Sequence, residues 1–215
     1  MPATAVVCKF HYVSMKQQEV AVANEKGTWE MKLGYELTFS PVTEGSPENK
    51  LFWKWTPSGE FHFTTPDQAL AQTFKFRHDY YIILQMTLPE KQYGALLKFI
   101  FQHMRTDETV ALNGTDKTIY YDLEFLPVSG TIKEATEEDK IFYKKAPTAL
   151  LKFGTINEDA ARMFLFGEKY YVILRDAELL NPDGTLKAPM PNAETIGETP
   201  TSRGPVLNDD KALTT

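Results

Sequence analysis

The feature that most constrains this chain is a similarity between its first and second halves, at a spacing of about 90 residues. Shifted by 90 positions, residues 48–84 align without a gap with residues 138–174, and fourteen of the aligned pairs are identical. Random pairing would give about two. The first members of the identical pairs are Glu48, Lys50, Phe52, Lys54, Pro57, Phe63, Thr65, Ala71, Phe74, Phe76, Tyr80, Tyr81, Ile83 and Leu84. The sequence therefore predicts an internal duplication.

The similarity continues toward the N-terminus with small changes of spacing. Residues 7–24 match 96–113 at a shift of 89, and 35–42 match 121–128 at a shift of 86, so a turn is shorter in the second copy. The predicted organisation is a first β unit over 1–88, a second over 89–178 and a remaining segment over 179–215, with Thr87–Glu90 as the connection.

Each unit is predicted to be mainly β, because the aromatic share of 13% suits pleated, half-buried surfaces and the apolar residues alternate. The expected strands are 5–15, 18–23, 28–41, 60–65 and 80–84 in the first unit, and 117–127, 150–155 and 170–174 in the second. Hairpin turns are expected at Asn24–Gly27 and Asn113-Gly114. Residues 92–104 alone read as an amphipathic helix, but their match to the first strand favours a strand.

The remaining segments of each unit are predicted from turn and cap residues. Residues 43–59 and 129–149 are expected as long polar loops. Asp67 and Asn157 stand where the N-cap of a brief helix belongs. The predicted fold class is therefore α+β, with two tandem small barrels or rolled sheets, compatible with an OB-like fold.

The segment from Asn181 to Thr215 holds five prolines and three glycines and few large apolar residues. It lacks the apolar residues to build a core and is expected to be an extended arm that orders against a neighbour.

Charge and cysteine content narrow the classes of partner. The net charge of −6 comes from mixed signs, so no basic stripe indicates a duplex nucleic acid or an anionic membrane. Cys8 is the single cysteine, which excludes an intrachain disulfide and a thiolate zinc cage. The apolar run Ala5–Cys8 is too short for a signal peptide or a membrane span, so no Sec export is expected.

No catalytic residue, cofactor or metal ligand is predicted. His11, His62, His78 and His103 match Ile100, Lys152, Glu168 and Ser14 in the other copy, so a histidine role would be confined to one unit. Cys8 matches Leu97 and is best explained as a small buried hydrophobe. The known phosphate-binding, zinc-protease and serine-hydrolase motifs are absent from the sequence, which makes an enzyme the weakest class.

The best candidate binding residues interleave lysines with aromatic rings in the polar segments 48–57 and 138–147. They are Lys50, Trp53, Lys54 and Trp55 in the first copy and Lys140, Tyr143 and Lys144 in the second. Such residues stack bases and neutralise phosphates in single-strand binding proteins. They equally suit a protein interface, where aromatic anchors sit inside a polar rim. A third interpretation is purely structural, with Phe52 and Phe142 plugging the core and the lysines in solvent.

The chain resembles small single-unit proteins encoded by tailed bacteriophages in a set of motifs: Pro41-Val42, Ser46–Lys50, Phe52, Trp55–Pro57, Gly59-Glu60, Phe74 and Tyr80-Tyr81. The second copy keeps Pro127-Val128, Thr155–Asn157, Ala160-Ala161, Phe164 and Gly167–Val172, but has Ala146–Ala149 at the Thr-Pro-Ser-Gly turn. The resemblance covers both units but not 179–215, carries no catalytic residues and implies a phage accessory protein.

Three functions follow as hypotheses. The first is a non-enzymatic virion component, in the virion or host cytoplasm, whose partners are other phage subunits or copies of itself. The second is a single-stranded nucleic-acid-binding protein that uses the lysine and tryptophan residues above. The third is an inhibitor that occupies a host defence protein or its ligand.

Overall fold

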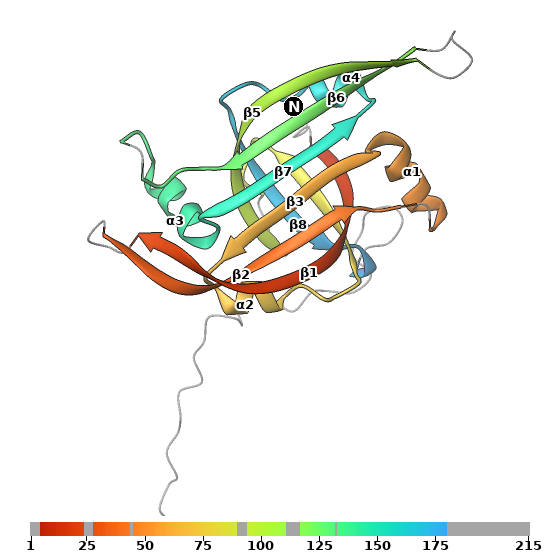
Figure 1. Cartoon of the computed structure of the whole chain (residues 1–215). Helices are drawn as coiled ribbons and strands as arrows, with labels where there is room; N and C mark the ends of the chain where they lie inside the picture. Colours follow the sequence, from red (N-terminus) through yellow and green to blue (C-terminus); the bar gives the residue numbers. More distant parts are fainter. Residues whose placement is uncertain are drawn as a thin grey trace, which may run out of the picture.

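Eight strands form one closed antiparallel barrel in the computed structural model, which describes residues 5–23, 28–43, 45–89, 94–110, 117–131 and 133–179 (Figure 1). The strands are β1 (Val6–Ala23), β2 (Trp29–Pro41), β3 (Ser58–Thr65), β4 (Asp79–Gln85), β5 (Ala95–Val110), β6 (Lys117–Pro127), β7 (Thr148–Thr155) and β8 (Lys169–Asp176). The helices are α1 (Pro47–Trp55), α2 (Gln68–Gln72), α3 (Glu137–Lys145), α4 (Glu158–Arg162) and the 3-10 turn η1 (Ala177–Leu179).

The two halves close this barrel together. The strand order is β1-β2-β3-β7-β6-β5-β8-β4, so β3 pairs with β7 and β4 pairs with β8 across the halves. Each half alone is a four-stranded sheet with two open edges, whose backbone groups are satisfied by the other half. The structure thus differs from the expected two separate barrels, and its eight strands are not the five of an OB-fold.

The same succession of elements occurs in both halves: two long strands, a helix, a strand, a short helix and a strand. The long strands carry matching bulges, between Tyr12 and Ser14 in β1 and between Phe101 and His103 in β5. The spacing of these bulges equals the shift of 89 in the sequence alignment. Element order and bulges thus follow the internal similarity of the sequence.

Phenylalanine rings fill the barrel interior. The fully buried ones are Phe10, Phe39, Phe61, Phe63, Phe99, Phe125 and Phe153. Phe39 stacks on Phe61 with ring centroids 5.2 Å apart and meets the Phe74 ring edge-on at 5.4 Å. Figure 1 places α2 at the bottom of the barrel and α4 at the top, and Phe74 and Phe164, just after these helices, pack into the same core cluster. The interior is therefore a packed core.

The predicted mainly β content is confirmed, including a strand over most of residues 92–104, where β5 begins at Ala95. Two local predictions are wrong. Residues 18–23 do not form a separate strand, because β1 runs unbroken through the polar Lys16 and Gln17 while pairing with β2. The supposed loops contain α1 and α3. The turns at Asn24–Gly27 and Asn113-Gly114, Glu90 of the connection and residues 180–215 lie outside the described residues.

Candidate functional site

The predicted binding residues of the first half lie on α1, whose start is set by two local signals. Ser46 accepts a hydrogen bond from the backbone N–H of Asn49 at 3.0 Å, and Pro47 occupies the first turn. Lys50, Lys54 and Trp55 are exposed and Trp53 is half-buried. The Lys54 ammonium lies 5.5 Å from the centre of the Trp55 ring, which makes a small cationic and aromatic surface.

The corresponding residues of the second half lie on α3, which begins with a reciprocal capping box between Thr136 and Asp139. Lys144 is exposed, while Lys140 and Tyr143 are half-buried. Lys140 pairs with Glu137 at 2.6 Å. The Tyr143 ring meets Trp29 of β2 edge-on, with ring centroids 6.4 Å apart. Tyr143 is therefore engaged in joining α3 to the first half.

The structure does not bring the two predicted groups together. Figure 1 shows α1 on the right of the barrel and α3 on the left. A single continuous site made of all the predicted residues is therefore excluded, and the α1 surface is the one with an exposed ring.

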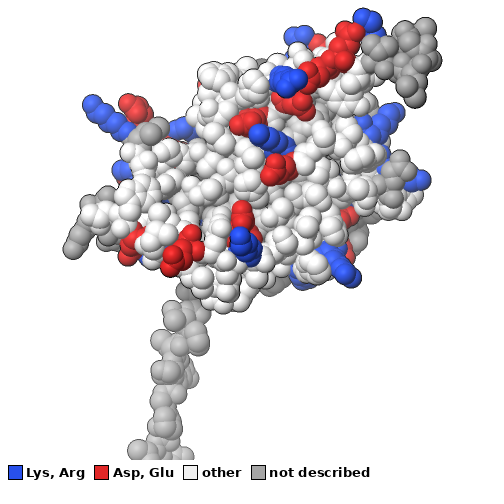
Figure 2. All heavy atoms as spheres, viewed as in Figure 1, with Lys and Arg blue, Asp and Glu red and all other residues white. Residues whose placement is uncertain are grey.

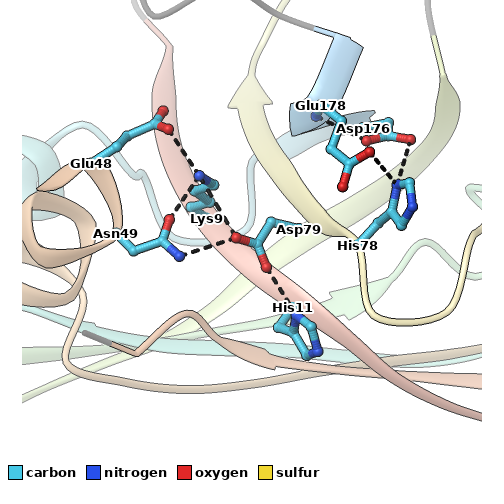
Figure 3. A network of polar contacts seen from close by, with 8 residues as sticks. All are labelled: Lys9, His11, Glu48, Asn49, His78, Asp79, Asp176 and Glu178. Carbon is cyan, nitrogen blue, oxygen red and sulfur yellow. Dashed lines mark hydrogen bonds and ion pairs between the residues drawn. The ribbon is translucent and has the colours of Figure 1, made fainter. Parts of the chain in front are cut away.

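A buried lysine network holds α1 against the barrel wall (Figure 3). Lys9 of β1 alternates with the core residues Cys8 and Phe10, yet it is only 5% exposed because α1 covers it. Its ammonium donates to Glu48 at 3.0 Å and to Asn49 at 2.7 Å, both in the first turn of α1. Asp79 of β4 lies 3.7 Å away and receives a hydrogen bond from Asn49 at 3.1 Å.

The second half carries a matching network under α3. Lys98 of β5 pairs with Glu138 and, at 3.0 Å, with Asp139 of α3. Lys169 of β8 donates to Asp139 at 2.6 Å, where the first half has Asp79 and Asn49. A tyrosine donates to the glutamate in both halves, Tyr81 to Glu48 and Tyr171 to Glu138. Both helices are thus anchored by one buried lysine each.

These networks lower the pKa of the carboxyl group of Asp139 and raise the pKa of the hydroxyl group of Tyr81. Burial opposes ionisation of Asp139, but the hydrogen bonds from Lys169 and Lys98 outweigh it and hold its pKa well below the ordinary value. Burial and the bond to Glu48 raise the pKa of Tyr81. Each charged group of these networks faces a partner within the protein, so the arrangement anchors the helices to the barrel.

Sequence reasoning missed the networks although a signal was present. Lys9 and Lys98 are identical across the repeat but fall in strands where every second residue is buried. A lysine conserved between the halves within an apolar strand indicates a buried cation, which needs carboxylate partners. Carboxylate partners of both lysines lie in the segments 46–49 and 136–139. The cap residues in these segments also predict the starts of α1 and α3.

An apolar groove of about 350 Å³ lies between β1, α1 and α4. Its lining includes Val7, Leu51, Phe52, Trp55 and Met163. The thiol of Cys8 also lines the groove, and burial raises its pKa to about 12. The thiol is therefore protonated at neutral pH, and the expectation of a small buried hydrophobe is confirmed.

A polar cleft of about 500 Å³ lies on the outer wall formed by β3, β5, β6 and β7. Charges of both signs line it, and Lys152 pairs with Glu124 at 3.0 Å. Figure 2 shows this face with acidic and basic side chains interspersed. A surface of this kind lacks the field of one sign that draws in a phosphate backbone.

An exposed apolar surface lies on the hairpin of β1 and β2, where β2 extends beyond its pairing with β3 at Tyr35. Trp29, Met31 and Leu33 are 55%, 59% and 54% exposed and share one face of the strand. Toward the barrel the same face continues into the buried Tyr35 and Leu37. We call the three exposed residues the hairpin face.

No protein-family model matches the chain, and no curated protein sequence matches it. Among the described residues, no helix has both the length and the apolar character needed to cross a membrane.

Proposed function

We propose that this protein is a non-enzymatic accessory protein of a tailed bacteriophage that acts by protein–protein contact, as a component of the virion. Its two halves descend from one duplicated unit, and residues 179–215 supply an arm to a neighbouring subunit. The support from the sequence is the internal duplication, the resemblance to phage proteins and the acidic charge.

The observation that carries the proposal is the hairpin face. Three large side chains on one strand face are more than half exposed. Contiguous exposed apolar residues of this kind are typical of protein interaction sites. The packed phenylalanine interior complements this argument, because it fills the space in which other small barrels hold a ligand.

The second half provides a matched control for this surface. Ile119 of β6 is the counterpart of Leu33 at the shift of 86, is 48% exposed, and has Lys117 at the position matching Met31. Within the described residues of the two hairpins, the contiguous apolar face therefore belongs to the first half. Leu33→Glu and Met31→Glu test it, and Ile119→Glu reproduces the chemical change at the equivalent place.

The experiment is to measure incorporation into virions by mass spectrometry of purified particles, for the wild-type chain and the three variants. We expect Leu33→Glu and Met31→Glu to lower incorporation at least about tenfold, because a charge is buried at the contact, and Ile119→Glu to leave it unchanged. If infected cells contain the wild-type chain while purified virions lack it, the virion role is wrong. Capture of a host protein by the wild-type chain alone would favour the inhibitor hypothesis instead.

One observation favours single-stranded nucleic acid as a second candidate. Lys50, Lys54 and Trp55 are all exposed on α1, with the Lys54 ammonium close to the Trp55 ring. Binding of a labelled oligonucleotide at low salt should then weaken with added salt and fall with Trp55→Ala. Binding that is absent, or that Trp55→Ala does not change, removes this candidate.

A further inference from the structure

We propose that His78, Asp176 and Glu178 form a binding site for a divalent transition-metal ion, with Zn²⁺ as the best match and Mn²⁺ as the alternative. The site lies at the end of β8, it shares no residue with the α1 network or the hairpin face, and it is independent of the proposed function. Figure 3 shows the three side chains converging.

The pairing of β4 with β8 brings the three residues together. His78 precedes β4, Asp176 ends β8 opposite Tyr80, and Glu178 lies in η1. Asp176 accepts a hydrogen bond from the backbone N–H of Glu178 at 3.0 Å, which turns the Glu178 side chain toward the histidine. The donors therefore come from both halves of the barrel.

The distances match those of a metal site. His78 Nδ1 lies 3.1 Å from Asp176 Oδ2 and 3.5 Å from Glu178 Oε2. One ligand atom from each residue lies within 4.8 Å of the others. Zinc bonds of about 2.0–2.2 Å in a tetrahedral site place the ligand atoms about 3.4 Å apart. Small side-chain rotations would complete three bonds and leave a fourth position for water.

The charges also suit a divalent cation. Nδ1 of an imidazole carries at most one hydrogen, yet carboxylate oxygens of both Asp176 and Glu178 face this nitrogen of His78. Asp176 has a side chain only 10% exposed, so its charge is poorly screened. The Lys75 ammonium lies 3.9 Å from Asp176, at the edge of the cluster, and its side chain is mostly exposed. One imidazole and two carboxylates are donors that Zn²⁺ and Mn²⁺ accept.

The positions related by the repeat show that the fold does not require this cluster. At the shift of 90, His78 corresponds to Glu168 in the second half, while Asp176 and Glu178 correspond to Met86 and Leu88 in the first, and the barrel closes there equally. Another pair of a histidine and a carboxylate gives a contrast. His11 lies 2.8 Å from Asp79, but the Lys9 ammonium already supplies the cation of that network. Among the described residues, the His78 cluster is the one group that brings three potential metal ligands of this kind within reach of one another.

The test is calorimetric titration of the full chain, stripped of metal with a chelator, using zinc chloride and manganese chloride in separate runs. Glu178→Gln and His78→Gln each remove one ligand, and the former lies at a side chain 65% exposed, so its fold is preserved. His11→Gln is the control, since it removes a histidine paired with a carboxylate outside the site. Melting temperature with and without metal provides a second readout.

We expect one ion bound per chain, an affinity at least about tenfold lower in Glu178→Gln and His78→Gln, and wild-type affinity in His11→Gln. At the same zinc concentration, the melting temperature should rise less in Glu178→Gln than in the wild type and in His11→Gln. The proposal is overturned if neither metal binds the wild type at about 1 mM, where a built site would be saturated. Wild-type affinity in Glu178→Gln would overturn it too, because the ion would then bind elsewhere.

Discussion

Lys169 donates a hydrogen bond of 2.6 Å to Asp139, and the equivalent contact of the first half runs in the opposite direction, from helix to strand. There the helix residue Asn49 donates to the strand residue Asp79 at 3.1 Å. The two halves keep the contact while exchanging which element carries the donor. In either arrangement the buried lysine, Lys9 or Lys98, is paired with carboxylates.

This exchange predicts a compensating double substitution. Asp139→Asn should lower the free energy of unfolding by about 3 kcal/mol, because Lys98 and Lys169 lose a buried carboxylate. Adding Lys169→Asp copies the first half and should recover much of the loss. Urea denaturation of the wild type, both single variants and the double variant measures the coupling. A double variant that is less stable than the sum of the single effects would contradict the interpretation.

The depressed pKa of Asp139 predicts a loss of stability in acid. Because its pKa is lower in the folded chain than the ordinary value of about 3.9, the unfolded chain takes up a proton first as pH falls. The contribution is therefore present in full above about pH 5 and is lost progressively as the pH falls from about 4 toward the lowered pKa of the folded chain. Unfolding free energies between about pH 2 and 6 should fall steeply for the wild type and more gently for Asp139→Asn. Equal slopes would show that Asp139 is not responsible.

The shared barrel predicts that neither half folds as a monomer. A fragment of residues 1–89 exposes the edges of β3 and β4 and half of the phenylalanine core. It should be unfolded, or fold only as a dimer in which a second copy replaces the missing half. The full chain should unfold in one transition. Analytical ultracentrifugation with circular dichroism tests the fragment, and a folded monomer would favour two independent units.

A matched pair of backbone positions predicts effects of opposite sign. Arg77 and Gly167 correspond at the shift of 90 and have φ of 66° and 80°, a region that glycine adopts without strain. Gly167→Ala should lower the free energy of unfolding by about 1 kcal/mol through backbone strain. A steric clash would not contribute, because a Cβ at this position meets no atom within 4 Å. Arg77→Gly should raise it by less, because glycine also frees the unfolded chain. Thermal denaturation of both variants measures this.

The protonated Cys8 thiol predicts slow alkylation. With the pKa raised to about 12 by burial, thiolate is scarce at neutral pH, and the side chain is 1% exposed. Iodoacetamide should modify the native chain slowly and the urea-unfolded chain rapidly. Comparable rates in the two states would show that β1 opens readily beside α1.

Part of the fold could be predicted because its signals are local. Alternation such as that of Tyr35, Leu37 and Phe39 identified strands, and the cap residues Asp67 and Asn157 identified α2 and α4. The same kind of signal was overlooked at Ser46 and Thr136, where cap residues precede charged segments that resemble loops. The candidate binding residues were consequently assigned to loops instead of helices. Their exposure depends on which face of each helix meets the barrel.

The sequence alone was enough to predict the strands and the aromatic scaffold and to show the internal similarity, since residues a few positions apart reveal period and capping. That the two halves share one barrel is evident only from the tertiary structure. The exposed edge of β3 could pair with any compatible strand, and the closed sheet shows that its partner is β7. The tertiary structure also decided that Lys9 is buried and that His78 meets Asp176. These contacts join residues far apart in the chain, and their partners become neighbours only once the barrel has closed.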